Sequence, residues 1–167
     1  DTNWQPQVFV HDRNTGTTHE PASLPDFLDY RQRSRRIEEL AAFVGNEVNY
    51  APAEGEPARL QALATTAEFL PMLGLQPTVG RQFTPAETRP GGPAVALISE
   101  GFWIRGLARD PDVLGRTLRL DDMSVSIVGV MPRGADFGVF QVLAAADYSR
   151  SCADRGARAS VDIWLPR

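Results

Sequence analysis

The stretch from Pro93 to Pro132 constrains the fold most, because it places three different kinds of element in direct succession. It begins with the apolar run 94–98, which has the length of a strand buried on both faces. Ser99 follows in the position of a helix N-cap, where its hydroxyl can accept from an unpaired backbone amide. The apolar spacing that comes next predicts a short helix over 100–108.

The same stretch ends in a predicted β-hairpin over 116–131. Apolar and polar residues alternate on both sides of Asp121-Asp122, a pair typical of a tight turn. The apolar phase changes between Ile127 and Val128, so the returning strand is either covered on both faces or bulged near Gly129. We therefore expect a strand, a short helix and a hairpin as one compact unit.

The chain before this unit predicts a strand at Val8-Val10 and a loop from Asp12 to Ala22. Helical spacing of apolar residues then predicts a helix over 24–44 that ends at Gly45 as a C-cap. The segment 58–65 alternates as a half-exposed strand does.

Thr65 and Glu68 match a capping box, so we expect a second helix over 66–73. The proline- and glycine-rich segment 75–93 reads as an irregular connection.

The chain after Pro132 is less informative. The run 139–146 is apolar enough for either a helix or a strand, 150–159 is polar, and 161–165 alternates as a final strand does. Trp103 and Trp164 each lie in an apolar run, and we expect both in the core. Together these elements predict an α+β fold, a small mixed domain with short helices packed on a mostly antiparallel or mixed sheet.

Composition excludes several classes of function. The 167 residues are 43% hydrophobic and 23% charged, as in folded domains, and the net charge of −4 argues against binding to nucleic acid or anionic lipid. No apolar run reaches the ~20 residues that a membrane span requires. Cys152 is the one cysteine, so no intrachain disulfide can form.

A search for catalytic chemistry finds no convincing constellation. Ser99 lacks the glycine on both sides that a nucleophile elbow needs, and an N-cap is the simpler interpretation. Asp121-Asp122 could be a carboxylate pair for acid–base work, but it stands at a hairpin tip, where exposure to solvent does not suit that role. Cys152 has no histidine near it in sequence. We therefore predict no catalytic residue and no hydrolase activity.

Binding chemistry is equally sparse. The two histidines, His11 and His19, match no metal-ligand spacing, and Gly91-Gly92 precedes a strand rather than a helix, unlike a phosphate loop. An anion or partner site is one interpretation of the arginine cluster, and a solvated helix face is the simpler one; the cluster is Arg31, Arg33, Arg35 and Arg36. An aromatic cage is one interpretation of the three tryptophans, and core packing is the simpler one; these are Trp4, Trp103 and Trp164. We predict no metal and no cofactor.

Three stretches resemble the extracytoplasmic core domain of MacB-type ABC transporter permeases, including the duplicated orphan permeases and the wider FtsX-like group. They are LPDFLDYRQRSRRIEELAAF at 24–43, the region from EFLPMLGLQPTVGRQFTPAE at 68–87 through 132, and VDIWLPR at 161–167. The phrase LGLQPTVGRQF at 73–83 is specific in combination.

The resemblance implies a domain inserted between the first two transmembrane helices of an inner-membrane permease, and exposed to the periplasm. In the family this domain is not an enzyme. It relays movement of the transmembrane helices, driven by a cytoplasmic ATPase in the same chain or a separate one, to a periplasmic substrate or partner in export. A second copy of the domain and a periplasmic adaptor are further implied partners.

The family domain has a porter-like part and a small α/β, Sabre-like part, which we assign to residues 1–63 and 64–167. Two departures from the family pattern stand out. The segment 133–160 is longer than expected, and the strand and helix that complete the porter-like part should follow Arg167. We therefore expect residues 1–63 to be incompletely packed. The alternative function, from a different class, is a stand-alone periplasmic ligand-binding module.

Overall fold

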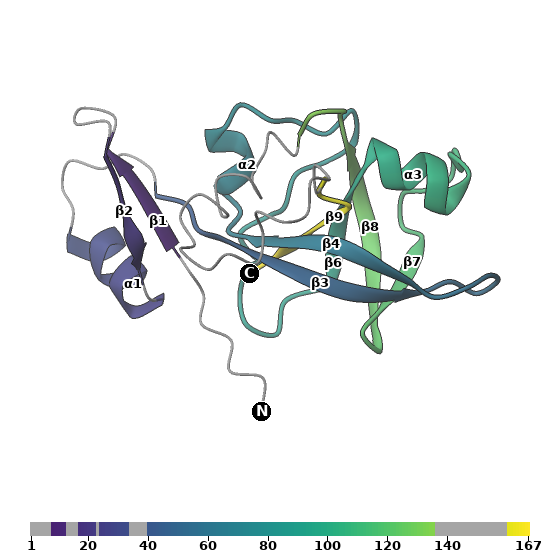
Figure 1. Ribbon diagram of the computed structural model, residues 1–167, viewed down its shortest axis with the longest axis horizontal. Helices are drawn as coiled ribbons and strands as arrows, with labels where there is room; N and C mark the ends of the chain where they lie inside the picture. Colours follow the sequence, from purple (N-terminus) through teal and green to yellow (C-terminus); the bar gives the residue numbers. More distant parts are fainter. Residues whose placement is uncertain (1–7, 13–16, 23, 34–39, 136–159) are drawn as a thin grey trace, which may run out of the picture.

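The computed structural model describes residues 8–12, 17–22, 24–33, 40–135 and 160–167 (Figure 1). The predictions for 139–146 and 150–159 lie outside these residues, as do Trp4 and Cys152. The described part is a mixed α+β fold with short helices on a mixed sheet, as the sequence predicts.

The chain begins with a small unit of two strands and one helix, which we call the N-terminal unit. Its strands β1 (Val8–Asp12) and β2 (Thr17–Ala22) pair antiparallel with each other, and α1 (Leu24–Arg33) follows. The strand predicted at Val8-Val10 is confirmed. The loop predicted over 12–22 is wrong for its second half, because pairing with β1 makes β2 a strand in spite of its polar residues.

The remaining strands form one seven-stranded mixed sheet, in the order β5-β8-β6-β9-β4-β3-β7. They are β3 (Phe43–Ala51), β4 (Ala58–Thr65), β5 (Val79–Gly80), β6 (Val95–Ser99), β7 (Thr117–Leu120), β8 (Met123–Met131) and β9 (Ile163–Pro166). Because β7 pairs with both β3 and β8, six of these strands close into a ring (Figure 1). We call residues 40–135 and 160–167 the sheet body.

The long helix predicted over 24–44 is confirmed at Leu24–Arg33 and wrong at 40–44, while 34–39 lie outside the described residues. Residues 43–51 form β3 instead, which pairs with every residue of β4, from Phe43↔Thr65 to Tyr50↔Ala58. Gly45 is therefore a strand residue, not a helix C-cap. Pairing with a continuous antiparallel strand outweighs the local helical spacing, because helix propensity contributes less free energy than a complete set of strand contacts.

The central unit predicted from 93–132 is confirmed. The strand β6 leads into α3 (Glu100–Leu107), and β7 and β8 form the hairpin. The turn residues Asp121 and Asp122 have positive φ, as a type I′ turn requires. The bulge, one of the two alternatives for the change of apolar phase, is present, because Ala96 pairs with Ile127 and Leu97 with Gly129, so Val128 is the extra residue.

The sheet separates two apolar cores, because side chains of consecutive strand residues point to opposite faces. One core fills the ring and is covered by α3 through Phe102 and Leu107. The other lies on the opposite face under α2 (Phe69–Met72) and includes Leu63, Leu97 and Trp164. The core position predicted for Trp164 is confirmed, since it is 1% exposed.

Trp103 differs from the prediction. It is only half-buried, at the margin of the ring core. Its indole Nε1 donates to the carbonyl of Asp110 at 2.9 Å, and the guanidinium of Arg109 stands 5.5 Å from the ring centroid. Trp103 therefore has an apolar side against the core and a polar edge at the surface, where the exposed Arg109 lies over its ring.

The predicted capping box at Thr65 and Glu68 is not formed. Thr65 is the last residue of β4, and α2 begins only at Phe69 with no side-chain cap from Glu68. The helix predicted over 66–73 is therefore present but shorter. Pairing of Thr65 with Phe43 and Pro166 holds it in the sheet and prevents it from turning toward the helix.

The expected division between 63 and 64 falls inside β4. Strands from both sides of that point share the seven-stranded sheet, since β4 pairs with β3 on one side and with β9 on the other. By contrast, β1 and β2 pair only with each other among the described strands. The visible division of the chain is between the N-terminal unit and the sheet body (Figure 1).

Candidate functional site

Ser99 acts as a helix cap. It has extended φ and ψ, and its Oγ accepts from the backbone N–H of Phe102 at 3.1 Å. The half-buried side chain has no histidine among its described partners. The interpretation of Ser99 as an N-cap is confirmed.

We expect Ser99→Ala to lower the free energy of unfolding by about 1 kcal/mol, because it removes one hydrogen bond to an unpaired helical amide. Urea unfolding of wild type and variant would measure this loss. The matched control is Ser124→Ala, at an exposed strand position, with an effect within about 0.5 kcal/mol. Equal effects of the two substitutions would contradict the assignment.

The backbone pairing does not set the two histidines opposite each other. The register of β1 and β2 places His11 opposite Thr18 and His19 opposite Val10, so the two histidines are not cross-strand partners. Within the described ranges, no group of three or more His, Cys, Asp or Glu residues could hold a metal ion.

Asp121 has a structural role in place of an acid–base role. Its Oδ1 accepts from the backbone N–H of Asn49 at 3.0 Å and from the Asn49 amide Nδ2 at 2.8 Å. Its own N–H donates to the carbonyl of Asn49 at 3.0 Å. The hairpin turn therefore continues the pairing of β3, and Asp121 makes the hydrogen bonds that a neighbouring strand residue would make.

Gly91 and Gly92 form a turn before β6. Gly91 has φ +77°, and the N–H of Gly92 donates to the carbonyl of Arg89 at 2.9 Å. The turn leads into a strand, so it does not present a row of N–H groups as a phosphate loop does.

Arg81 and Glu87 form the most buried carboxylate pair with a bidentate geometry. Two guanidinium nitrogens of Arg81 donate to the Glu87 carboxylate at 2.7 and 3.0 Å, and the N–H of Thr84 adds a bond of 2.7 Å. The Glu87 side chain is 5% exposed. The hydrogen bond from Arg81 lowers the pKa of Glu87 to about 2 against the opposing effect of burial, and the same bond raises the pKa of Arg81.

This pair should make stability depend on pH in a defined window. A lowered folded pKa means that the unfolded chain binds the proton more readily, so the contribution is complete above about pH 4.5 and is lost as pH falls toward about 2. Denaturant melts between pH 6 and pH 2.5 would measure the loss. Glu87→Gln should cost about 1.5–3 kcal/mol at neutral pH and flatten this part of the profile. An unchanged slope in the variant would contradict the assignment.

Asp162 joins three elements at the start of β9. Its backbone donates to Gln61 at 2.8 Å and accepts from Ser99 at 2.9 Å, and its Oδ2 accepts from the Gln61 N–H at 3.1 Å. Its Oδ1 is paired with Arg105 of α3, while its side chain is 8% exposed. Asp162 therefore fixes β9 to β4, β6 and α3 at once.

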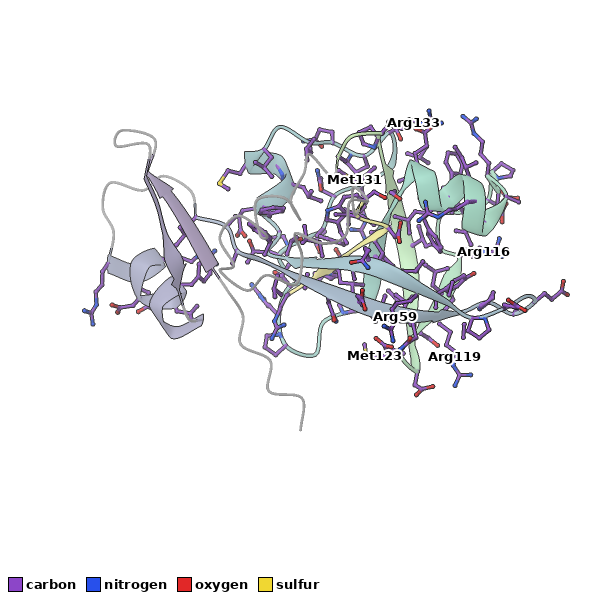
Figure 2. All side chains as sticks on the ribbon, viewed as in Figure 1. Arg59, Arg116, Arg119, Met123, Met131 and Arg133 are labelled. Carbon is purple, nitrogen blue, oxygen red and sulfur yellow. The ribbon has the colours of Figure 1, made fainter. Side chains whose placement is uncertain are left out.

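The loop after α3 is held by a second carboxylate. Asp110 accepts from the N–H of Asp112 at 2.9 Å and from Arg116 at 2.6 Å. Arg133, after β8, pairs with Glu100 of α3 at 3.1 Å (Figure 2). These arginines have carboxylate partners in the fold, which accounts for their charge without a ligand.

The arginines of α1 divide between their own helix and the sheet body. Arg33 pairs with Asp29 at 2.7 Å, one turn away on α1. Arg31 instead reaches Glu68, 37 residues along the chain and directly before α2, at 3.1 Å. Arg35 and Arg36 lie outside the described residues. We call the contact between Arg31 and Glu68 the junction, since it connects the N-terminal unit with the sheet body.

The arrangement is therefore one of anchoring and connection, and none of the candidate groups forms a nucleophile–base pair among the described residues. Sequence reasoning missed the junction and the roles of Glu87 and Asp162. An acidic residue inside an apolar run, as Asp162 is between Val161 and Ile163, is the one sequence signal that could have pointed to this role. The junction has no sequence signal, because it depends on tertiary placement.

Comparison with known proteins assigns the fold. A sequence profile described as the MacB-like periplasmic core domain matches residues 3–163. The chain belongs to this family. The resemblance seen in the sequence is thereby confirmed, and this MacB-like domain is part of the group of ABC transporter permease domains.

Solved structures show the same fold at low sequence identity. The extracellular domain of the noncanonical ABC-type transporter YknZ from Gram-positive bacteria has a TM-score of 0.62 and 13% identity, over 97% of this chain and 72% of that one. The periplasmic region of MacB from Actinobacillus actinomycetemcomitans also has a TM-score of 0.62, with 11% identity over 99% and 65% of the two chains.

A permease domain from Porphyromonas gingivalis has a TM-score of 0.53 and 18% identity, over 97% of this chain and 58% of that one. The MacB-like domain therefore spans less than two thirds of the second and third of these structures. A search of curated proteins gives no significant match. In the part of the chain that the structure describes, no helix has both the length and the apolar character of a membrane span.

Proposed function

We propose that this MacB-like domain relays movement of flanking transmembrane helices, driven by a cytoplasmic ATPase, to a periplasmic substrate or partner during export. The domain would act with the rest of its own permease, and a second copy or a periplasmic adaptor would be its further partners. It would itself carry out no catalysis and need no cofactor.

The observation that supports this proposal best is the position of β9. This strand lies inside the sheet, parallel to β4 and antiparallel to β6, with Leu63 and Leu97 both opposite Trp164. Force along an internal strand is shared by the hydrogen bonds to two neighbours. Asp162 adds its bonds to Gln61 and Arg105 at the same place. A sheet body built in this way can transmit displacement without unfolding.

The two parts of the relay are proposed to meet at the junction. The assignment of a porter-like half to 1–63 and a Sabre-like part to 64–167 divides β4, so we propose that the moving parts are the N-terminal unit and the sheet body. The alternative of a stand-alone ligand-binding module gains no specific support from the described residues.

Cross-linking of the junction in the full permease, together with its ATPase, tests this proposal. Arg31→Cys and Glu68→Cys would be joined by a short bismaleimide in a Cys152→Ser background. If the two parts must move, the cross-link should lower the rate of ATP hydrolysis several-fold. Each single cysteine variant treated with the same reagent is the control. A cross-linked permease that hydrolyses ATP as fast as the controls would contradict the relay.

A further inference from the structure

The junction is as exposed as surface pairs of the sheet body such as Arg59 with Glu47, but it differs from the two buried pairs of the body. Inside the body, Glu87 and Asp162 are almost fully buried, and each accepts bonds from backbone as well as from an arginine. At the junction both partners are open to water, with side chains 54% exposed for Arg31 and 36% for Glu68. The sheet body thus has two buried pairs of its own, while the pair between the two parts is an exposed and weak one.

Each end of the junction is held on a firm support. On one side, α1 is anchored by the buried Phe27. On the other side, Glu68 directly precedes Phe69 and Leu70, which are buried in the core under α2. The ion pair therefore reports the relative position of two supported elements and not the movement of a loose side chain.

The junction is also placed between separate sheets. The N-terminal unit shares no strand pairing with the sheet body among the described residues, so no ladder of backbone hydrogen bonds holds the two together. Exposed ion pairs contribute little net free energy and are weakened by salt. A contact of this kind can form and open with small changes in load.

We infer that Arg31 and Glu68 form a reversible latch that holds the N-terminal unit against the sheet body and opens when the permease moves. The opening of the latch during transport rests on the proposed relay, but its effect on docking in the resting permease does not. The latch sets the population of the docked arrangement, while the buried pairs keep the sheet body unchanged.

Distance measurements between spin labels in the full permease without nucleotide test the latch. The labels are placed at the exposed positions Gln32 and Met123, one on each part, after replacement of Cys152 and any other native cysteine. We expect Glu68→Gln to lower the ratio of docked to undocked molecules by about 1.5- to 5-fold. Raising the salt concentration should act in the same direction on wild type and have less effect on Glu68→Gln.

The matched control is Arg33→Gln, which removes an exposed arginine pair from the same helix without touching the junction. It should leave the ratio unchanged, and the exchanged pair of Arg31→Glu with Glu68→Arg should restore it. The latch is excluded if Glu68→Gln behaves as wild type, or if Arg33→Gln has the same effect. Because no nucleotide is present, a failed latch leaves the relay to be judged on its own test.

Discussion

Trp164→Ala should lower the free energy of unfolding by about 3–5 kcal/mol, the range for removing a large buried aromatic side chain. Trp164 lies in an internal strand and packs in the core with Leu63 and Leu97. Its removal leaves a cavity lined by neighbours that are fixed in a sheet and cannot collapse. Urea unfolding followed by circular dichroism measures the loss.

Trp103→Ala is the matched control, because it removes the same side chain from a half-buried site. Its cost should be clearly smaller, about 1–2 kcal/mol, close to the typical effect of a point mutation. Trp164→Phe should also lose less than Trp164→Ala, since the Nε1 of Trp164 has no hydrogen-bond partner among the described residues. Equal losses at Trp103 and Trp164 would show that the assignment of the core is wrong.

Gly80→Ala should lower the free energy of unfolding by about 2–5 kcal/mol, because it combines the strain of a left-handed backbone with overpacking. Gly80 has φ +83° and pairs with Gly129 where β5 crosses the bulged part of β8. An added Cβ would overlap the carbonyl oxygen of Val128 and stand 2.7 Å from the Cα of Gly129. Both contacts are with backbone, which cannot rotate away.

Gly74→Ala separates the two causes. Gly74 also has a positive φ, of +70°, but a Cβ there meets nothing within 4 Å. This variant should lower the free energy of unfolding only by the cost of a left-handed backbone with a Cβ, about 1–2 kcal/mol. If Gly80→Ala is no worse than Gly74→Ala in the same urea melts, the close approach of β5 to β8 is not a constraint on the fold.

The sequence predicted best where local chemistry and tertiary structure agree. Ser99 caps a helix whose apolar face has a core to cover, and Asp121-Asp122 turns a hairpin whose strands both have partners. The change of apolar phase between Ile127 and Val128 left two alternatives, and the structure has both, a bulge and a core on each face of the sheet.

Prediction failed where distant partners decide. Helical spacing was followed as far as Val44, yet Phe43 and Val44 already belong to β3, because β4 offers a complete antiparallel partner. Glu68 looks like part of a capping box but pairs with Arg31 from another unit. Trp103 lies in an apolar run, yet its helix presents it to the rim of the core. The order of residues in the chain does not show which strand or helix will pack against a given segment.

The candidate site could be predicted only by exclusion. The sequence argued against a catalytic constellation, and the described residues assign Ser99 and Asp121 to capping and strand pairing. The positive feature, the junction, joins residues 37 apart that have no common motif. Its weakness is visible only when its exposure is compared with the burial of Glu87 and Asp162.

Spin-label distances with and without a non-hydrolysable ATP analogue, in the full permease with its ATPase, test the proposed relay most directly. The pair at Gln32 and Met123 spans the N-terminal unit and the sheet body, and a pair at Gln76 and Met123 lies within the body. We predict that the nucleotide shifts the first distance and leaves the second unchanged. Two unchanged distances would contradict the relay, and a change in the second would contradict the rigid sheet body on which it depends.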